Sequence, residues 1–328
     1  MQEIDVTAIG NAIVDVLAHA DDAFLDEHSL TKGSMALIDE NQAHALYERM
    51  GQAVECSGGS AGNTAAGLAG LGARTAYVGK VKNDQLGEVF AHDIRAVGVD
   101  FDTLPAKDGP ATARCLILVT PDAQRTMNTY LGACRELGPN DLDAERIRRS
   151  KVTYMEGYLW DPPGAKQAFL EASRIAEAAG RKTSLSLSDP FCVERHREDF
   201  LDLVEHHVDL LFANEEEICS LYQVPDIEQA AAAVRGHCEL AILTRSEKGA
   251  LVLNGEQSFE VAAEPIERLV DTTGAGDLFA AGFLYGYTQG RPPAEAARIG
   301  AICAAEVIGH FGARPDADLA ALVAQRLG

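Results

Sequence analysis

Residues 271–277 read Asp-Thr-Thr-Gly-Ala-Gly-Asp, and this loop says more about the fold than any other part of the chain. It follows an extended segment and opens an apolar helix that begins Leu278-Phe279-Ala280-Ala281. Glycines let a backbone approach a ligand closely, and the free N–H groups of a first helical turn bind anions. A carboxylate in the same turn would repel a bound phosphate, so Asp277 is unexpected in a simple phosphate site. It makes sense if Asp277 accepts a proton from a hydroxyl while the neighbouring amides hold the phosphoryl group that is transferred. Those amides belong to Gly274, Ala275 and Gly276.

The same loop departs from other known nucleotide-binding loops. A dinucleotide-binding G-x-G-x-x-G needs a third glycine where Phe279 stands, and the chain has no G-K-S or G-K-T of a Walker loop. The H-R-D and D-F-G triplets of protein kinases are absent as well. Taken alone, Asp277 is better explained as an acid that caps its own helix. A second feature is therefore needed to assign the chemistry.

That second feature is Ser57-Gly58-Gly59-Ser60-Ala61-Gly62-Asn63, which precedes a helix of small residues over 65–72. The loop exposes its backbone and places a polar side chain, Asn63, at a helix start. Helix capping and tight packing explain this loop alone nearly as well as ligand binding does.

Short strand-like runs alternate with amphipathic stretches along the chain, which is typical of a parallel sheet covered by helices on both faces. We therefore predict an α/β fold, with strands near 6–10, 75–79, 152–156, 183–187, 210–213 and 241–244. Helices are expected near 63–71, 86–96, 165–179, 215–222, 275–289 and 294–309. A hairpin, 112–120 and 125–131 around the turn 121–124, breaks the alternation, and 33–39 also looks extended. We expect one domain over 1–328, with a small β-lid from segments near 13–39 and 110–135.

Composition and charge limit the classes of partner and the cellular compartment that we expect for the protein. The formal charge of −22 on 328 residues disfavours nucleic acid and anionic membranes. No secretory signal or membrane-spanning run is visible. The seven cysteines are odd in number and contain no C-x-x-C pair, so a reducing cytoplasm is expected. Cys192, His196 and the His206-His207 pair lack the spacing of a zinc site.

Together the two glycine loops resemble the signatures of the ribokinase-like (PfkB) carbohydrate kinase family. The first loop runs on to Gly79-Lys80-Val81-Lys82-Asn83-Asp84-Gln85-Leu86-Gly87, as the family's N-terminal signature does, and the resemblance extends from Gly10 to Gly312. It implies a three-layer fold, ATP and Mg²⁺ as cofactors, and phosphorylation of a small sugar or nucleoside, with Asp277 as the base.

Several segments are similar to the adenosine kinases of this family. Gly10-Asn11-Ala12-Ile13-Val14-Asp15 resembles their start, where the Asn and Asp contact ribose. Asp15 suits a cis-diol chemically, because an ionised carboxylate accepts from two hydroxyls; an acid at an exposed strand end is the alternative. The resemblance assigns Gly58, Gly59 and Asn63 to the sugar as well. Tyr158 or Trp160 would stack on the base, or both are core aromatics.

The resemblance also assigns the ATP side. Asn214 and Glu217 match an N-x-x-E motif that helps to place Mg²⁺ through water, although a solvated acidic helix start explains them too. Thr244, Ser246 and Gly249 belong to the loop beside the ATP nucleoside, and Arg125 resembles a lid arginine that reaches phosphate. Asp271 and Thr273 stand where many relatives hold a monovalent cation such as K⁺.

We therefore expect conversion of adenosine to AMP. The alternatives are a kinase for inosine, guanosine or a free sugar of the ribose or fructose type, and a nucleoside- or sugar-binding regulator without catalysis. The protein is expected to be a monomer or a homodimer; dimerisation through an exposed edge of the lid strands is plausible.

Overall fold

The protein is described here from a computed structural model, which covers residues 2–122 and 124–328. Its main sheet has nine strands in the order β14-β13-β12-β11-β10-β9-β1-β5-β6. The pairs from β12 to β6 are parallel, and β13 and β14 add an antiparallel edge. The strands are β1 Ile4–Ile9, β5 Thr75–Val78, β6 Asp100–Phe101, β9 Ser150–Glu156, β10 Lys182–Ser186, β11 Leu210–Asn214, β12 Leu240–Thr244, β13 Ala250–Asn254 and β14 Gln257–Val261.

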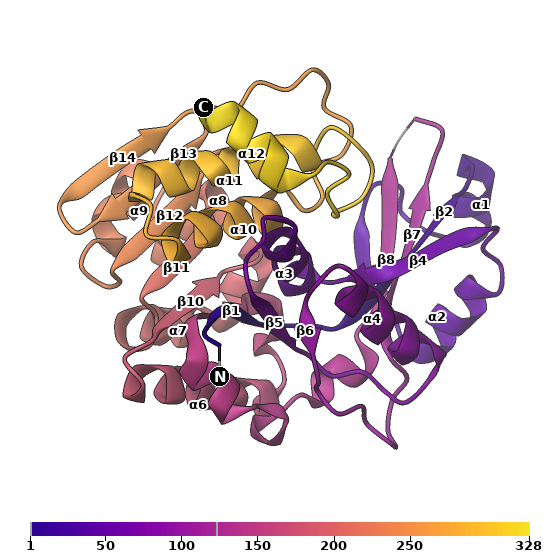
Figure 1. The fold of residues 1–328 in the computed structure, drawn as a ribbon. Coiled ribbons are helices and arrows are strands. Elements are labelled where there is room, and N and C mark those ends of the chain that lie inside the picture. The colour runs from indigo at the N-terminus through magenta and orange to yellow at the C-terminus, as the bar shows by residue number, and fades with distance from the viewer. Residues whose placement is uncertain (1, 123) are drawn as a thin grey trace.

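Helices cover both faces of this sheet (Figure 1). One face packs against α3 Ser60–Gly70, α4 Gln85–Ala96, α10 Ala275–Thr288 and α11 Pro293–Val307. The other packs against α5 Ala144–Arg149, α6 Pro163–Ala178, α7 Pro190–His206, α8 Glu215–Tyr222 and α9 Ile227–Val234. In β11, Leu210 and Phe212 face the first layer, whereas Leu211 and Ala213 face the second. This burial on both sides explains the nearly continuous apolar runs of the strands, and the predicted three-layer α/β fold is confirmed.

A second sheet of five strands, in the order β3-β8-β7-β2-β4, projects to one side of the main body (Figure 1). We call it the lid. Its strands are β2 Ile13–His19, β3 Met35–Leu37, β4 Ala53–Gly58, β7 Ala113–Val119 and β8 Arg125–Tyr130, and it carries α1 Asp22–Glu27 and α2 Glu40–Tyr47. The predicted hairpin is β7 and β8, although Ala123 of its turn lies outside the described residues. The predicted lid segments omitted β4, which pairs with β2 and leads directly into the first glycine loop.

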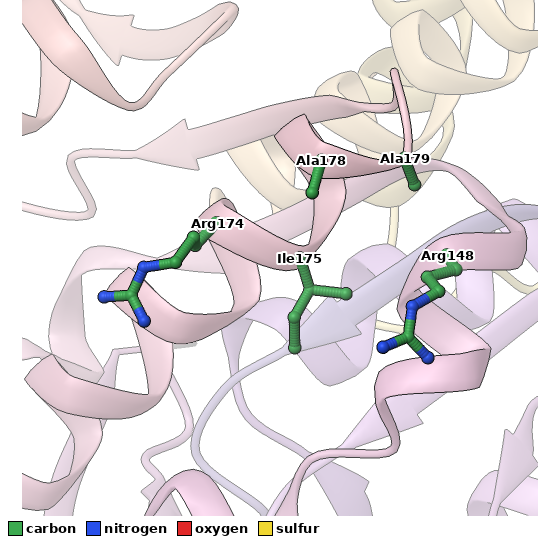
Figure 2. A pocket seen from close by; sticks show the side chains of 5 residues that line it. All are labelled: Arg148, Arg174, Ile175, Ala178 and Ala179. Atoms are coloured by element: carbon green, nitrogen blue, oxygen red, sulfur yellow. The ribbon is translucent and has the colours of Figure 1, made fainter.

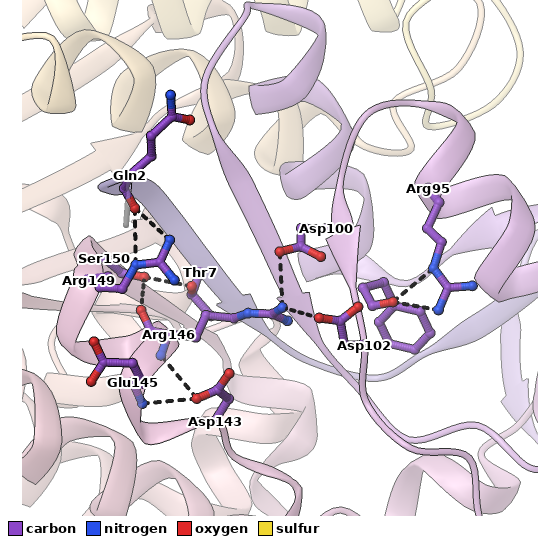
Figure 3. A network of polar contacts seen from close by, with 11 residues as sticks. Gln2, Thr7, Arg95, Asp100, Asp102, Asp143, Glu145, Arg146, Arg149 and Ser150 are labelled. Atoms are coloured by element: carbon purple, nitrogen blue, oxygen red, sulfur yellow. Dashed lines mark hydrogen bonds and ion pairs between the residues drawn. The ribbon is translucent and has the colours of Figure 1, made fainter.

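Ion pairs and hydrogen bonds tie the amino ends of the main-sheet strands (Figure 3). Arg146 of α5 donates to Asp100 and Asp102 at 3.0 and 2.5 Å, which fixes the edge strand β6. At the start of β9, the hydroxyls of Ser150 and Thr7 are 2.7 Å apart. The opposite, carboxyl ends of the strands carry the loops that bind ligands in open α/β sheets.

The chain ends in α12 Leu319–Leu327, which packs beside α11. Among the described residues, no helix combines the length and the apolar character that crossing a membrane requires.

Candidate active site

Asp277 lies in the first turn of α10 and is tied to the other glycine loop by three hydrogen bonds. Ser60 Oγ donates to Asp277 Oδ1 at 2.6 Å, and Asn63 Nδ2 donates to Oδ2 at 2.9 Å. Thr64 Oγ1 donates to the main-chain oxygen of Asp277 at 3.2 Å. Burial raises the pKa of Asp277, while the bonds from Ser60 and Asn63 and the charge of Arg314 oppose that rise. The two loops predicted to act together are thus in direct contact.

The start of α10 offers an open backbone. Gly274 has a φ of +80°, and a Cβ there would lie 2.8 Å from Ala313 Cβ, so glycine is required. A Cβ at Gly276 would instead meet nothing within 4 Å. Ala275 N–H closes the turn by donating to Thr272 O at 3.2 Å. In the described part of the chain, the N–H groups of Gly274, Gly276 and Asp277 meet no protein acceptor, whereas the N–H of Ala275, which was also predicted to face an anion, is used within the turn.

The predicted sugar residues line the junction of the lid and the main body. Asp15 of β2 lies against Gly58 of β4, where a Cβ would come within 2.3 Å of the carboxylate. Burial raises the pKa of Asp15 to about 6, against the lowering effect of Arg314 and Arg125. Asn63 Oδ1 is buried without a partner among the described residues. An orphaned acceptor of this kind fits a donor supplied by a ligand.

Asn11 is held by a residue that the sequence analysis missed. Glu156, at the carboxyl end of β9, accepts from Asn11 N at 2.8 Å and from Asn11 Nδ2 at 2.6 Å. Its other oxygen accepts from Ala61 N at 2.6 Å, in the first turn of α3. Burial raises the pKa of Glu156 to about 7, although these three donors oppose the rise. Gly59 is also tightly placed, because a Cβ there would lie 2.2 Å from Asn11 O.

Arg125 reaches from the lid into the second glycine loop. Its Nη1 lies 2.9 Å from Asp271 Oδ2, and both side chains are buried. The Asp271 carboxylate also accepts from Thr273 N at 3.0 Å and from Gly312 N at 3.1 Å. Arg125 Nε and Nη2 are buried without a partner in the described chain. Two unused donors of a guanidinium indicate a site for an anion.

Asn214 and Glu217 form a reciprocal cap at the start of α8, which follows β11. Asn214 Oδ1 accepts from Glu217 N at 2.8 Å, and Glu217 accepts from Asn214 N and Nδ2 at 2.9 and 2.6 Å. Burial raises the pKa of Glu217 to about 7. Both the helix-capping alternative and a role toward a ligand are compatible with this geometry.

Thr244 ends β12, next to β11, and starts the third loop at this edge of the sheet. Ser246 has a φ of +51°, and Gly249 has a φ of +84° with the site of a Cβ only 2.0 Å from Val261 O. The tight turn therefore requires glycine at 249. Thr244 is paired with Asn214 of the neighbouring strand β11, so this turn begins beside the start of α8, which carries Glu217.

The two candidate aromatics have different environments. Trp160 is 3% exposed and packs on Phe169 and Phe200, with Nε1 donating to Asp199 at 2.8 Å, so it belongs to the core. Tyr158 is 37% exposed at the carboxyl end of β9. Only Tyr158 is therefore available to a ligand.

A cavity lined by Arg148, Arg174, Ile175, Ala178 and Ala179 contains none of these residues (Figure 2). It lies between α5 and α6, and both arginines pair with acids one helical turn away. The arginine that does lie near Asp277 is Arg314, a second residue that sequence analysis missed.

Known proteins resemble this chain in sequence and in fold. Residues 34–319 match the sequence pattern of the pfkB family carbohydrate kinases. The solved adenosine kinase of Sinorhizobium meliloti is 54% identical, with a TM-score of 0.91 and 99% of each chain covered. A probable sugar kinase protein from Rhizobium etli CFN 42 is 52% identical, with a TM-score of 0.92 and the same coverage. The cytidine kinase of Thermococcus kodakarensis is 30% identical over 270 residues, which are 80% of this chain and 91% of that protein.

Proposed function

This chain belongs to the pfkB family of carbohydrate kinases, and on that premise we propose that it phosphorylates the primary hydroxyl of adenosine to give AMP. The family and its kinase relatives make it an ATP-dependent phosphotransferase. The observation that carries the proposal is the contact of Asp277 with Ser60 and Asn63, which joins the base to the sugar loop. Similarity to the Sinorhizobium meliloti adenosine kinase supports the choice of acceptor.

The residues suggest how the transfer proceeds. Asp277 takes the proton of the CH₂OH group, and the hydroxyl oxygen bonds to the γ-phosphorus of ATP. The bond from that phosphorus to the bridging β–γ oxygen breaks, which gives ADP and a phosphate monoester. Asp15 and Asn63 hold the sugar, and the free N–H groups of Gly274 and Gly276 stabilise charge on the moving phosphoryl group. Arg125, with two unused donors, binds phosphate oxygens when the lid covers the site and excludes water.

Mg²⁺ fits the residues at the start of α8. The Glu217 carboxylate faces two donors of Asn214, and each of its oxygens keeps a lone pair for a metal-bound water. When bound, the ion would neutralise charge on the ATP phosphates.

A monovalent cation fits less well at Asp271 and Thr273. The Asp271 carboxylate already faces the guanidinium of Arg125 and two backbone N–H groups. Its charge is therefore compensated within the protein, and we derive no step from such a cation.

The test is ADP release with ATP and Mg²⁺ across adenosine, inosine, guanosine, cytidine, ribose and fructose, with Asp277→Asn alongside. Fast turnover of adenosine that falls by about 10² to 10⁴ in the variant would support both acceptor and base. A preference for ribose, fructose or another nucleoside would overturn adenosine and leave the chemistry in place. A folded protein that binds nucleoside but releases no ADP would be a regulator.

We also propose a cytoplasmic monomer or homodimer. All seven cysteines are free in the part of the chain described, which supports a reducing compartment. Light scattering of the purified protein measures the oligomeric state.

A further inference from the structure

Arg314, in the loop between α11 and α12, reaches the glycine loop that leads into α3. Its Nε and Nη2 donate to Ser57 O at 3.1 and 2.6 Å, and Nη2 also lies 2.8 Å from Ser57 Oγ. Nη1 donates to Gly62 O at 3.0 Å. All three guanidinium nitrogens are thus engaged, and their acceptors bracket residues 58–61. One side chain spans the segment that carries Ser60 and ends just before Asn63.

The same segment has an anchor on its other side. Asp93 of α4 accepts from Ser57 N at 2.7 Å and from Ser57 Oγ at 2.6 Å. Arg314 and Asp93 therefore share Ser57, and a displacement of this residue would move Ser60 away from Asp277. Because Ser60 bonds to Asp277 at 2.6 Å, the base depends on the position of this loop.

The acceptors of Arg314 are neutral oxygens, so its positive charge acts on acids that it does not touch. Arg314 lowers the pKa of Asp277 and of Asp15, against the effect of burial. Several other groups also act on Asp277 or Asp15. Ser60 and Asn63 of α3 hydrogen-bond to Asp277, and Arg125 of β8 acts on Asp15. Asp15 of β2, Glu156 and Tyr154 of β9 and Tyr158 after it are themselves coupled to Asp277.

We propose that Arg314 is a positioning residue for phosphoryl transfer, which holds the 57–62 loop against Asp277 and supplies the positive charge that faces the two carboxylates. The inference rests on the proposed function of the same site. An arginine with a purely structural role would make the same hydrogen bonds, but its loss would change stability alone. Charge and hydrogen bonding are separable, because lysine keeps the charge and lacks the planar fork that serves several acceptors.

The test compares Arg314→Lys, Arg314→Met and Arg326→Met by kcat, KM and the pH dependence of kcat/KM, with the acceptor that the wild type uses best. Arg326 is a matched control for lost charge, since it is half-exposed on α12 and lies 3.9 Å from Glu264. In Arg314→Met we expect kcat/KM to fall by about 10- to 100-fold. Its acid limb should move to higher pH, because Asp277 must be ionised to act as a base and Arg314 lowers its pKa.

Arg314→Lys should keep the acid limb of the wild type and raise KM for the acceptor. The proposal would be overturned if Arg314→Met had the same kinetics and pH profile as the control Arg326→Met, even if Arg314→Met had a lower melting temperature. If Arg314→Met does not fold, Arg314→Lys decides, and an unchanged KM would overturn the positioning role. If the wild type releases no ADP with any acceptor, the proposed function is wrong. This outcome differs from the one that overturns the role of Arg314.

Discussion

Gly276→Ala tests the ligand site separately from the stability of the fold. A methyl group at this position meets no protein atom within 4 Å, and Gly276 is not among the residues with positive φ. Alanine therefore fits without strain and improves helix propensity in the first turn of α10 by up to about 1 kcal/mol. We expect the free energy of unfolding to stay equal or to rise slightly.

Activity should respond in the opposite direction. The open space beside Gly276 is where an anion would approach the free N–H groups of Gly274 and Gly276. The methyl group would keep the anion away from these N–H groups, and loss of one such hydrogen bond lowers kcat by about 10² to 10³, which is about 3 to 4 kcal/mol of transition-state stabilisation. Coupled ADP release gives kcat and KM for ATP, and urea unfolding of the same preparations gives stability.

Two further glycines provide the controls. Gly51→Ala also meets nothing within 4 Å but lies outside the site, so both activity and stability should be unchanged. Gly274→Ala should destabilise the protein by about 1 to 2 kcal/mol or more, because φ is +80° and Ala313 blocks the methyl group. Wild-type kinetics in Gly276→Ala would refute the anion site at the start of α10. Lost stability in that variant would refute the open space.

Two more predictions concern buried charge. Burial raises the pKa of Glu156 from 4.5 to about 7, so the folded state keeps a proton that the unfolded chain releases, and stability falls between these pH values. Glu156→Gln lacks this carboxyl, so from pH 5 to pH 8 its free energy of unfolding should fall by about 2 to 3 kcal/mol less than that of the wild type. Urea unfolding at each pH measures this, and the same pH dependence in both proteins would contradict it. Arg125 compensates Asp271, so kcat of the wild type should change less than about twofold when K⁺ replaces Na⁺. Arg125→Met should raise KM for ATP and introduce stimulation by K⁺, and a wild type that requires K⁺ would disprove the internal compensation.

The sequence predicts the six strands from β12 to β5 well, because they are buried on both faces and are mostly apolar. It misses β6, β13 and β14, and β6 and β14 are partly exposed edge strands. The lid was harder to predict. In β4, Ala53 and Glu55 are partly exposed and Val54 is 67% exposed, so the strand lacks a buried run and reads as the approach to a glycine loop. In α7, a non-helical His196 interrupts the period that would have marked a helix.

Some residues of the site could be predicted from local motifs in the sequence, and others could not. Asp277, Asn63 and Asp15 lie in or near motifs whose spacing is visible along the chain, and the structure brings them together. Glu156 and Arg314 lie outside such motifs. Glu156 follows an apolar strand, as many solvated acids do. Arg314 binds Ser57 and Gly62, which lie 257 and 252 residues before it in the sequence. Their roles depend on contacts that no local pattern encodes.

Because the net charge of the chain is −22, the few arginines near the site matter for binding a phosphate. A phosphate must approach a site where Asp15, Asp277 and Glu156 are all buried, and the charge of Asp277 contributes to the raised pKa of the other two. Arg314 from the C-terminal loop and Arg125 from the lid both oppose that effect at Asp15. Arg314 makes four hydrogen bonds, three to Ser57 of the lid strand β4 and one to Gly62 of α3, whereas Arg125 lies on the lid strand β8. Part of the positive charge that acts on Asp15 therefore comes from the lid.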